Sequence, residues 1–243
     1  MTILVAMHLG SQTVLISDKF VFKEGKVVGE KFMKLHQANN FATVSGGSGE
    51  AMIHANNYLK GRTISGQSDL RGMSDDLLQK LNDPFGEHTS DVALMYVSAT
   101  INNQACLFTV IHDELKSGVR LKQLTDHSAG EILFAIPRTL AGQPGDSFKK
   151  EATIIFEAFM AGKGKHLKPH DAHTVAGLAK SIGGVLNKLA KETGVISKNY
   201  DISVINSTGQ SYTGVIDVDK YTKVMLMQKR GEKIIAGGMV CEM

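Results

Sequence analysis

Short apolar runs alternate with polar or glycine-rich breaks over the first fifty residues, which is typical of β-strands joined by turns. The apolar runs Thr2–Leu9 and Thr13–Ser17 flank the polar Gly10–Gln12, so this region predicts a β-hairpin. The spacing of apolar residues changes to that of a helix over Glu50–Leu59, directly after a glycine turn at Ser45–Gly49. Three more segments before this helix have strand character: Val27–Val28, Phe32–Leu35 and Phe41–Val44.

The remainder of the chain continues the alternation of strands and helices. Asn102-Asn103, between the apolar runs Asp91–Ser98 and Ala105–His112, predicts a second hairpin. Two long segments have one apolar face at helical spacing, Phe148–Met160 and Ala172–Lys191. Six other segments have the composition of strands: Val119–Leu124, Ile132–Ile136, Asp201–Ile205, Tyr212–Ile216, Thr222–Gln228 and Lys233–Ala236. The order of strands, two helices, strands, two helices and strands predicts an α+β or layered α/β fold with two sheets between helix layers.

Composition limits the class of protein. The 243 residues are 42% hydrophobic and 21% charged and contain no linker or low-complexity run, so we expect a single domain over residues 1–243 with one large core. No apolar stretch is long enough for a membrane helix, and Ile3–Leu9 is too short and lacks the basic start of a signal peptide. We therefore expect no association with a membrane.

Cysteine usage and net charge limit the compartment and the partners. The two cysteines, Cys106 and Cys241, suit a reducing compartment and lack the spacing of a metal site, so we expect a cytoplasmic protein without a structural disulfide. The net charge of +3 is small, the basic residues are scattered and tryptophan is absent, which argues against binding of nucleic acid. No motif requires a cofactor.

Three residues with catalytic chemistry stand at equal spacing: Thr2, Asp18 and Lys34 follow one another at intervals of 16 residues. Removal of Met1, which a small second residue permits, makes Thr2 the N-terminal residue. Its hydroxyl is then a nucleophile, and its own α-amine is a base with a reference pKa of about 7.7–8.0. A neighbouring Lys34 ammonium would lower the pKa of both groups, and an Asp18 carboxylate would keep a buried lysine charged. The glycine turn at 45–49 offers main-chain N–H groups for a developing oxyanion.

With these residues the chain resembles the proteasome β-subunit family, the N-terminal nucleophile threonine peptidases, which include proteasome-like peptidase subunits of bacteria. The matching residues are Thr2, Asp18 and Lys34 at the family's own spacing, and the Gly46-Gly47 pair before the first helix. The resemblance implies a four-layer αββα sandwich of two antiparallel sheets between helix layers, the N-terminal nucleophile hydrolase fold. It also implies that the Gly46 N–H stabilises the oxyanion and that Ser197 belongs to the catalytic group.

The resemblance further implies a substrate pocket and an assembly. Five mostly apolar residues would wall the first specificity pocket: Val21, Phe32, Val44, Ser48 and Met52. We therefore expect cleavage of polypeptides after hydrophobic residues. Members of the family stack into rings with the active sites on the inner wall, so we expect a six- or seven-fold homo-oligomeric ring. Such a ring is compatible with an unfolding ATPase as a partner.

Several positions depart from the family pattern. Relatives carry Gly-Ser-Gly after the strand that precedes the third helix, whereas this chain has Phe134–Thr139, with Thr139 as a candidate substitute for the serine. Relatives also often carry an aspartate three residues before the serine that corresponds to Ser197, and Gly194 stands there instead. The stretch from Lys34 to Gly46 is shorter than in many relatives.

These departures leave two other functions open. The same fold without a working Thr2, for example with Met1 retained, would serve as a scaffold or structural subunit of a larger assembly. A further alternative keeps the N-terminal threonine but directs it at a small amide. His166, His170 and His173 surround Pro169 with loosely metal-like spacing, but this pattern favours an exposed loop, and no metal site is predicted.

Overall fold

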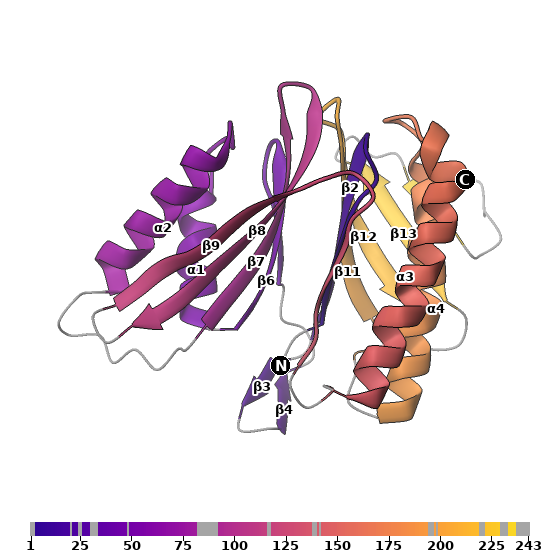
Figure 1. Cartoon of the computed structure of the whole chain (residues 1–243), viewed down its shortest axis with the longest axis horizontal. Coiled ribbons are helices and arrows are strands. Elements are labelled where there is room, and N and C mark those ends of the chain that lie inside the picture. The colour runs from indigo at the N-terminus through magenta and orange to yellow at the C-terminus, as the bar shows by residue number, and fades with distance from the viewer. Residues whose placement is uncertain are drawn as a thin grey trace.

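The computed structural model describes residues 3–19, 21–23, 26–29, 34–47, 49–81, 92–115, 118–137, 140, 142–193, 197, 199–218, 222–228 and 233–236. These residues form two large antiparallel sheets, a small two-stranded sheet and four α-helices (Figure 1). The predicted α+β class and its two antiparallel sheets are confirmed.

The first sheet has seven strands in the order β10-β1-β2-β11-β12-β13-β14. Its strands are β1 (Leu4–His8), β2 (Gln12–Asp18), β10 (Ile132–Ala135), β11 (Asn199–Asn206), β12 (Ser211–Asp217), β13 (Lys223–Gln228) and β14 (Lys233–Ala236). β1 and β2 form the predicted N-terminal hairpin and lie inside the sheet, because β10 and β11 pair with their outer edges. Every residue of both strands is buried, which explains the consecutive apolar residues Leu4–Met7 and Val14–Ile16.

The second sheet has five strands in the order β5-β6-β7-β8-β9. Its strands are β5 (Leu35–Gln37), β6 (Phe41–Gly47), β7 (Val92–Ile101), β8 (Gln104–Leu115) and β9 (Gly118–His127), and β3 (Val21–Lys23) pairs with β4 (Lys26–Gly29) in the small sheet. Asn102 and Asn103 join β7 to β8 with φ angles of 50° and 58°. Such a pair suits a tight hairpin turn, so the second predicted hairpin is confirmed.

The helices lie on the outer faces of the sheets (Figure 1). The helices α1 (Gly49–Leu59) and α2 (Gln67–Leu81) cover the second sheet, and α3 (Gln143–Ala161) and α4 (Ala172–Thr193) cover the first. The apolar side predicted for α4 is buried in full: Val175, Leu178, Ala179, Ile182, Val185, Leu186 and Leu189.

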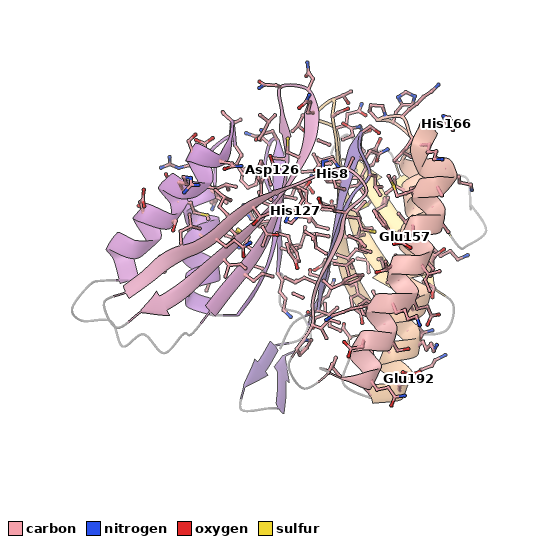
Figure 2. All side chains as sticks on the ribbon, in the orientation of Figure 1. His8, Asp126, His127, Glu157, His166 and Glu192 are labelled. Carbon is pink, nitrogen blue, oxygen red and sulfur yellow. The ribbon has the colours of Figure 1, made fainter. Side chains whose placement is uncertain are left out.

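Apolar side chains form three clusters, each packed between two neighbouring layers. One cluster lies between the first sheet and α3–α4 and includes Phe156 and Leu186, and a second lies between the second sheet and α1–α2 and includes Phe41 and Leu59. The third cluster joins the two sheets: Leu4, Ala6, Leu15, Leu35, Ala42, Val44, Tyr96, Leu107 and Ile205. Figure 2 shows side chains filling the space between the sheets and beneath the helices.

Element boundaries differ from the predicted ones at two positions that bear on the site. β6 continues through Ser45 and Gly46 to Gly47, where a turn was predicted, because pairing with β7 persists as far as Gly47 and Ala93. The helix α3 begins at Gln143, with Pro144 in its first turn, before the apolar periodicity begins at Phe148. The sequence patterns had assigned no range to α2 or β3.

Candidate active site

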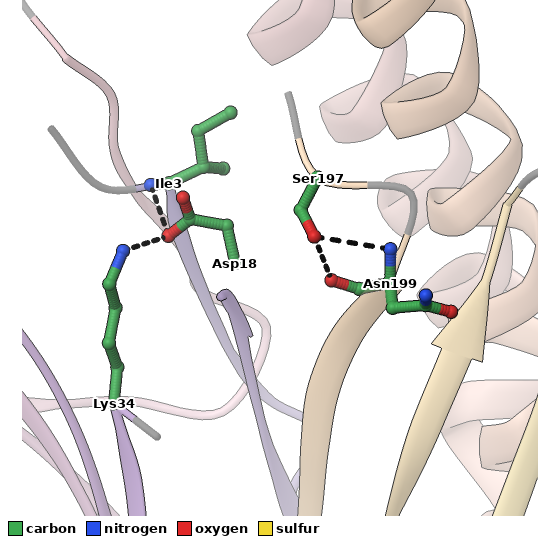
Figure 3. Close-up of polar contacts among 5 residues, drawn as sticks. All are labelled: Ile3, Asp18, Lys34, Ser197 and Asn199. Carbon is green, nitrogen blue, oxygen red and sulfur yellow. Dashed lines mark hydrogen bonds and ion pairs between the residues drawn. The ribbon is translucent and has the colours of Figure 1, made fainter. Parts of the chain in front are cut away.

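A buried ion pair joins Asp18 and Lys34. The Lys34 ammonium Nζ lies 2.6 Å from Asp18 Oδ1, and the two side chains are 3% and 5% exposed. Asp18 is the last residue of β2, and Lys34 directly precedes β5, so the pair links the first sheet to the second (Figure 3). Two residues that the sequence separates by 16 positions are therefore in direct contact.

The same carboxylate oxygen also binds the start of the chain. The main-chain N–H of Ile3 donates to Asp18 Oδ1 at 3.1 Å, and the Asp18 N–H donates back to the Ile3 carbonyl at 3.1 Å. The Lys34 ammonium and the Ile3 N–H thus meet on one oxygen atom (Figure 3). The contact closes the open end of the β1–β2 hairpin at the residue to which Thr2 is covalently bonded.

Burial disfavours the charged form of both partners. Burial raises the pKa of the Asp18 carboxyl, and the neighbouring Lys34 ammonium and the Ile3 N–H oppose that rise. Burial likewise lowers the pKa of the Lys34 ammonium, and the Asp18 carboxylate opposes that fall. Each partner therefore favours the charged form of the other, and removal of either one takes away the main group that opposes the effect of burial.

One group beside the pair and one ion pair between the following residues of the two strands were not predicted from the sequence. Tyr200 stands opposite Asp18 in the β2–β11 ladder, and burial together with the Asp18 carboxylate raises the pKa of its phenol. The next residue, Asp201, accepts from the Lys19 ammonium at 2.7 Å. These residues, like the Ile3 N–H, come together through strand pairing, and no local sequence pattern identifies them.

The end of β6 brings the glycine pair to the edge of the second sheet. Strands in an antiparallel sheet direct their N–H groups alternately to the two neighbouring strands. Thr100 N donates to Asn40 O at 2.7 Å, and the register continues to Gly46 opposite Leu94, so the Gly46 N–H is directed toward β7. The N–H of Gly47 is then directed to the β5 side, beyond Val44, the last β6 residue that pairs with β5. Gly47 has a φ of 104°, which favours glycine.

The hydroxyl of Ser197 forms its hydrogen bonds with Asn199 and not with Asp18 or Lys34. It is buried, and its hydroxyl donates to the Asn199 carbonyl at 2.6 Å and accepts from the Asn199 N–H at 3.2 Å. Figure 3 shows these bonds beside, and separate from, the contacts of Asp18 with Ile3 and Lys34. The assignment of Ser197 to the catalytic group stays a prediction.

Several predicted site residues lie outside the described residues: Thr2, Phe32, Ser48, Thr139 and Gly194. Val21 lies in β3 and Met52 in α1, and only their main chains are described. Val44 is buried in the cluster between the two sheets. The specificity pocket and the preference for hydrophobic residues therefore stay predictions.

The described residues contain no group of three His, Cys, Asp or Glu side chains that could hold a metal ion. His166 and His170 lie in the exposed connection from α3 to α4, and His173 is in the first turn of α4. Across the same part of the chain, no helix combines the length and the apolar character that crossing a bilayer requires.

Comparison with known proteins adds no assignment, since no family model matches the sequence and no curated protein matches it at a significant level. The resemblance to the proteasome β-subunit family therefore depends on the residues quoted for it: Thr2, Asp18, Lys34 and the Gly46-Gly47 pair.

Proposed function

We propose that the chain is a threonine-type endopeptidase subunit of a self-compartmentalising ring assembly, acting through the N-terminal threonine that removal of Met1 exposes. One observation carries the proposal. The buried Lys34–Asp18 pair is bonded to the main-chain N–H of Ile3, the residue that follows Thr2. A costly buried ion pair beside the chain start has a clear use if the N-terminal residue is the nucleophile.

The arrangement of the layers supports a finer assignment of the fold. The three apolar clusters separate a helix pair, a sheet, a second sheet and a second helix pair. We propose that this is the four-layer αββα sandwich of the N-terminal nucleophile hydrolases. In it β1 is an internal strand, paired with β10 on one side and with β2 on the other.

The role that follows for Lys34 is electrostatic. An ammonium beside Thr2 favours the neutral form of the α-amine and the anionic form of the hydroxyl, and both changes help a proton to leave the nucleophile. Asp18 has a different role. It keeps Lys34 charged and oriented, and through the Ile3 N–H it fixes the first peptide of the chain against the same oxygen atom.

The proposed reaction proceeds through an ester. The α-amine of Thr2 accepts the hydroxyl proton, and the threonine oxygen forms a bond to the carbonyl carbon of the substrate peptide. The C–N bond then breaks, and the leaving amine takes the proton from the Thr2 ammonium. Water, deprotonated by the same amine, attacks the ester, and the acid product leaves with Thr2 restored.

An N–H group at the end of β6 would hold the oxyanion in both tetrahedral intermediates. Gly46 is the donor that the family resemblance implies. The alternation of N–H directions along β6 favours Gly47 as the donor instead, because its N–H points to the β5 side at a position where β5 supplies no paired residue. We therefore propose the Gly46–Gly47 segment as the oxyanion site, with cleavage after hydrophobic residues as the expected specificity.

Hydrolysis of fluorogenic peptides tests this function. Three peptides with a hydrophobic, an acidic or a basic residue before the scissile bond are compared on the wild type, Thr2→Ala and Lys34→Met. We expect cleavage of the hydrophobic peptide, complete loss in Thr2→Ala and a loss of about 10²–10³-fold in Lys34→Met. Equal activity in the wild type and Thr2→Ala would exclude the proposed nucleophile.

A catalytically inactive scaffold subunit is the second candidate function. The bonding of Ser197 favours it, since both hydrogen bonds of the hydroxyl go to the main chain of Asn199. Glycine at position 194 in place of the family's aspartate has the same implication. Under this function the protein still assembles into a ring but does not cleave any of the three peptides.

A further inference from the structure

The connection from α3 to α4, residues 162–171, is an exposed and strongly basic segment that we call the basic loop. It contains three exposed lysines, Lys163, Lys165 and Lys168, and its one carboxylate belongs to Asp171. Asp171 Oδ2 accepts the main-chain N–H of Lys168 at 2.9 Å. Among the described residues, no carboxylate forms an ion pair with any of the three lysines.

Three consecutive carbonyls of the basic loop are fixed by side chains from elsewhere in the first sheet. The Ser11 hydroxyl donates to Leu167 O at 2.8 Å, Gln12 Nε2 donates to Lys168 O at 2.8 Å, and Asn206 Nδ2 donates to Pro169 O at 2.7 Å. Gln12 and Asn206 are completely buried. Surface loops normally leave such carbonyls to water, so these bonds hold the main chain of the loop in place at residues 167–169.

The anchors are themselves tied together. Asn206 Oδ1 accepts the main-chain N–H groups of Thr208 and Gln210 at 3.0 and 2.9 Å, and the Ser207 N–H donates to Ser11 O at 2.9 Å. The β1–β2 and β11–β12 turns thus form one support beneath the basic loop. A rigid support reduces the ordering entropy that a flexible loop would lose on binding a partner.

The basic loop lies far from the proposed active site. Its anchors Ser11 and Gln12 stand at the turn end of the β1–β2 hairpin, whereas Ile3 and Asp18 stand at the other end. Figures 1 and 2 show the same separation, with His166 at the end of the molecule away from the N-terminus. A partner on the loop would leave the space around Lys34 open.

We propose that the basic loop is a docking surface for an acidic segment of a partner protein. The three lysines, which have no carboxylate partner among the described residues, attract a carboxylate-rich chain, and the anchored main chain at 167–169 limits the backbone ordering that binding requires. The loop has no Phe, Tyr or Trp on which nucleic-acid bases could stack. This inference does not depend on the proposed peptidase activity.

Fluorescence anisotropy with a fluorescein-labelled decaglutamate peptide tests the proposal at low salt on the full-length protein. The test variant is Lys163→Glu/Lys165→Glu/Lys168→Glu. The control variant Lys149→Glu/Lys150→Glu/Lys191→Glu makes the same change in charge at exposed lysines of α3 and α4. Circular dichroism and gel filtration establish that both variants are folded and assembled like the wild type.

We expect the test variant to bind the peptide at least about tenfold more weakly than the wild type, and the control variant to bind nearly as tightly as the wild type. The variant Asn206→Leu, which removes one anchor and keeps every charge, should also weaken binding. Equal weakening in the test and control variants would overturn the proposal, because only net charge would then matter. Absence of binding by the wild type, or tighter binding of a labelled oligothymidine of equal length, would overturn it as well.

Discussion

At the scale of single residues, the molecule buries a carboxylate and an ammonium at Asp18 and Lys34, where either charge alone would be unstable. The pKa directions express this cost, since burial moves both groups toward their neutral forms and their contact opposes both shifts. A buried pair of this kind contributes little to net stability. Its position beside the start of the chain explains it better than a stabilising role does.

A double-mutant cycle measures the interaction free energy between Asp18 and Lys34. Asp18→Asn or Lys34→Met alone should lower the free energy of unfolding by about 3–5 kcal/mol, because each removes one partner of a buried ion pair. The double variant should be close to the wild type, since it removes both charges. Urea unfolding at pH 7 measures all four proteins.

The exposed pair Lys188–Glu151, with N···O of 2.9 Å, provides the control cycle. Lys188→Met and Glu151→Gln should change stability little, singly or together, because water screens both groups. Costs that simply add in the Asp18–Lys34 double variant would contradict the view that the two buried charges depend on each other.

His8 gives the fold a dependence on acid. Burial lowers the pKa of its imidazole below the ordinary value of 6.5, although Asp126 and Glu131 oppose the shift, and its Nδ1 accepts the Gly10 N–H at 3.1 Å. The folded state therefore holds His8 neutral while the unfolded chain binds a proton. Stability is complete above pH 6.5 and is lost as the pH falls from there through the lower pKa of the folded state.

Urea unfolding of the wild type and His8→Asn between pH 7.5 and 5 tests this dependence. Asparagine keeps an acceptor near Nδ1 but does not titrate, so the decline in stability toward acid should be shallower in the variant. His173→Asn, at an exposed position, should retain the wild-type decline. Parallel curves for the wild type and His8→Asn would show that another group is responsible.

At the scale of secondary-structure elements, α4 contains two adjacent glycines that differ in their surroundings. A Cβ at Gly183 would lie 2.7 Å from methyl groups of Ile216 and Thr222, whereas a Cβ at Gly184 would meet no atom within 4 Å. Gly184→Ala should stabilise the protein by about 0.5–1 kcal/mol through helix propensity. Gly183→Ala should destabilise it by about 1–3 kcal/mol through overpacking.

Thermal unfolding of the two alanine variants decides between propensity and packing. The pair is matched, because both substitutions add one methyl group at neighbouring positions of the same helix. Stabilisation by both would mean that α4 is not packed tightly against β12.

The sequence predicts those elements whose signals are local. Gly10 and the Asn102-Asn103 pair predict hairpins, because glycine and asparagine suit turns with positive φ. All three residues have a positive φ in the structure. The apolar stripe of α4 likewise follows from its spacing. β6 was predicted too short, because glycines favour a turn locally and the pairing with β7 that extends the strand is remote in sequence.

The candidate site was predicted from the chemistry of Thr2, Asp18 and Lys34 and from the spacing that these residues share with the family. The spacing of Asp18 and Lys34 indicated proximity, and the structure contains a direct contact between them. The Ile3 N–H could not be predicted, because every residue has a main-chain N–H and only tertiary packing selects one. The alternation that directs the Gly46 N–H toward β7 likewise depends on the register between strands.

At the scale of the whole molecule, two sheets share an apolar interface and a helix pair covers each outer face. Among the residues that the structure describes, large exposed apolar side chains occur on three different elements: Ile53 on α1, Ile154 on α3 and Met227 on β13. Contacts between different faces of neighbouring copies close into rings, whereas a two-fold dimer uses one shared face. The proposed ring requires contacts of the first kind, and Ile53 and Ile154 are candidate positions for them.

Native mass spectrometry should therefore detect an assembly of six or seven subunits, or of twice that number if two rings stack. Ile53→Glu and Ile154→Glu, tested singly, should shift the population toward smaller species if these residues lie in subunit contacts, whereas Lys150→Glu at an exposed position should not. A stable monomer across micromolar concentrations would contradict the ring.

The central claim is that Thr2, with a free α-amine, is a nucleophile activated beside the Lys34–Asp18 pair. Intact mass measured before and after treatment with a threonine-directed peptide epoxyketone tests it most directly. We expect a chain that lacks Met1 and gains the mass of one inhibitor, with no gain in Thr2→Ala. A correctly trimmed chain that stays unlabelled would contradict the peptidase and leave the scaffold.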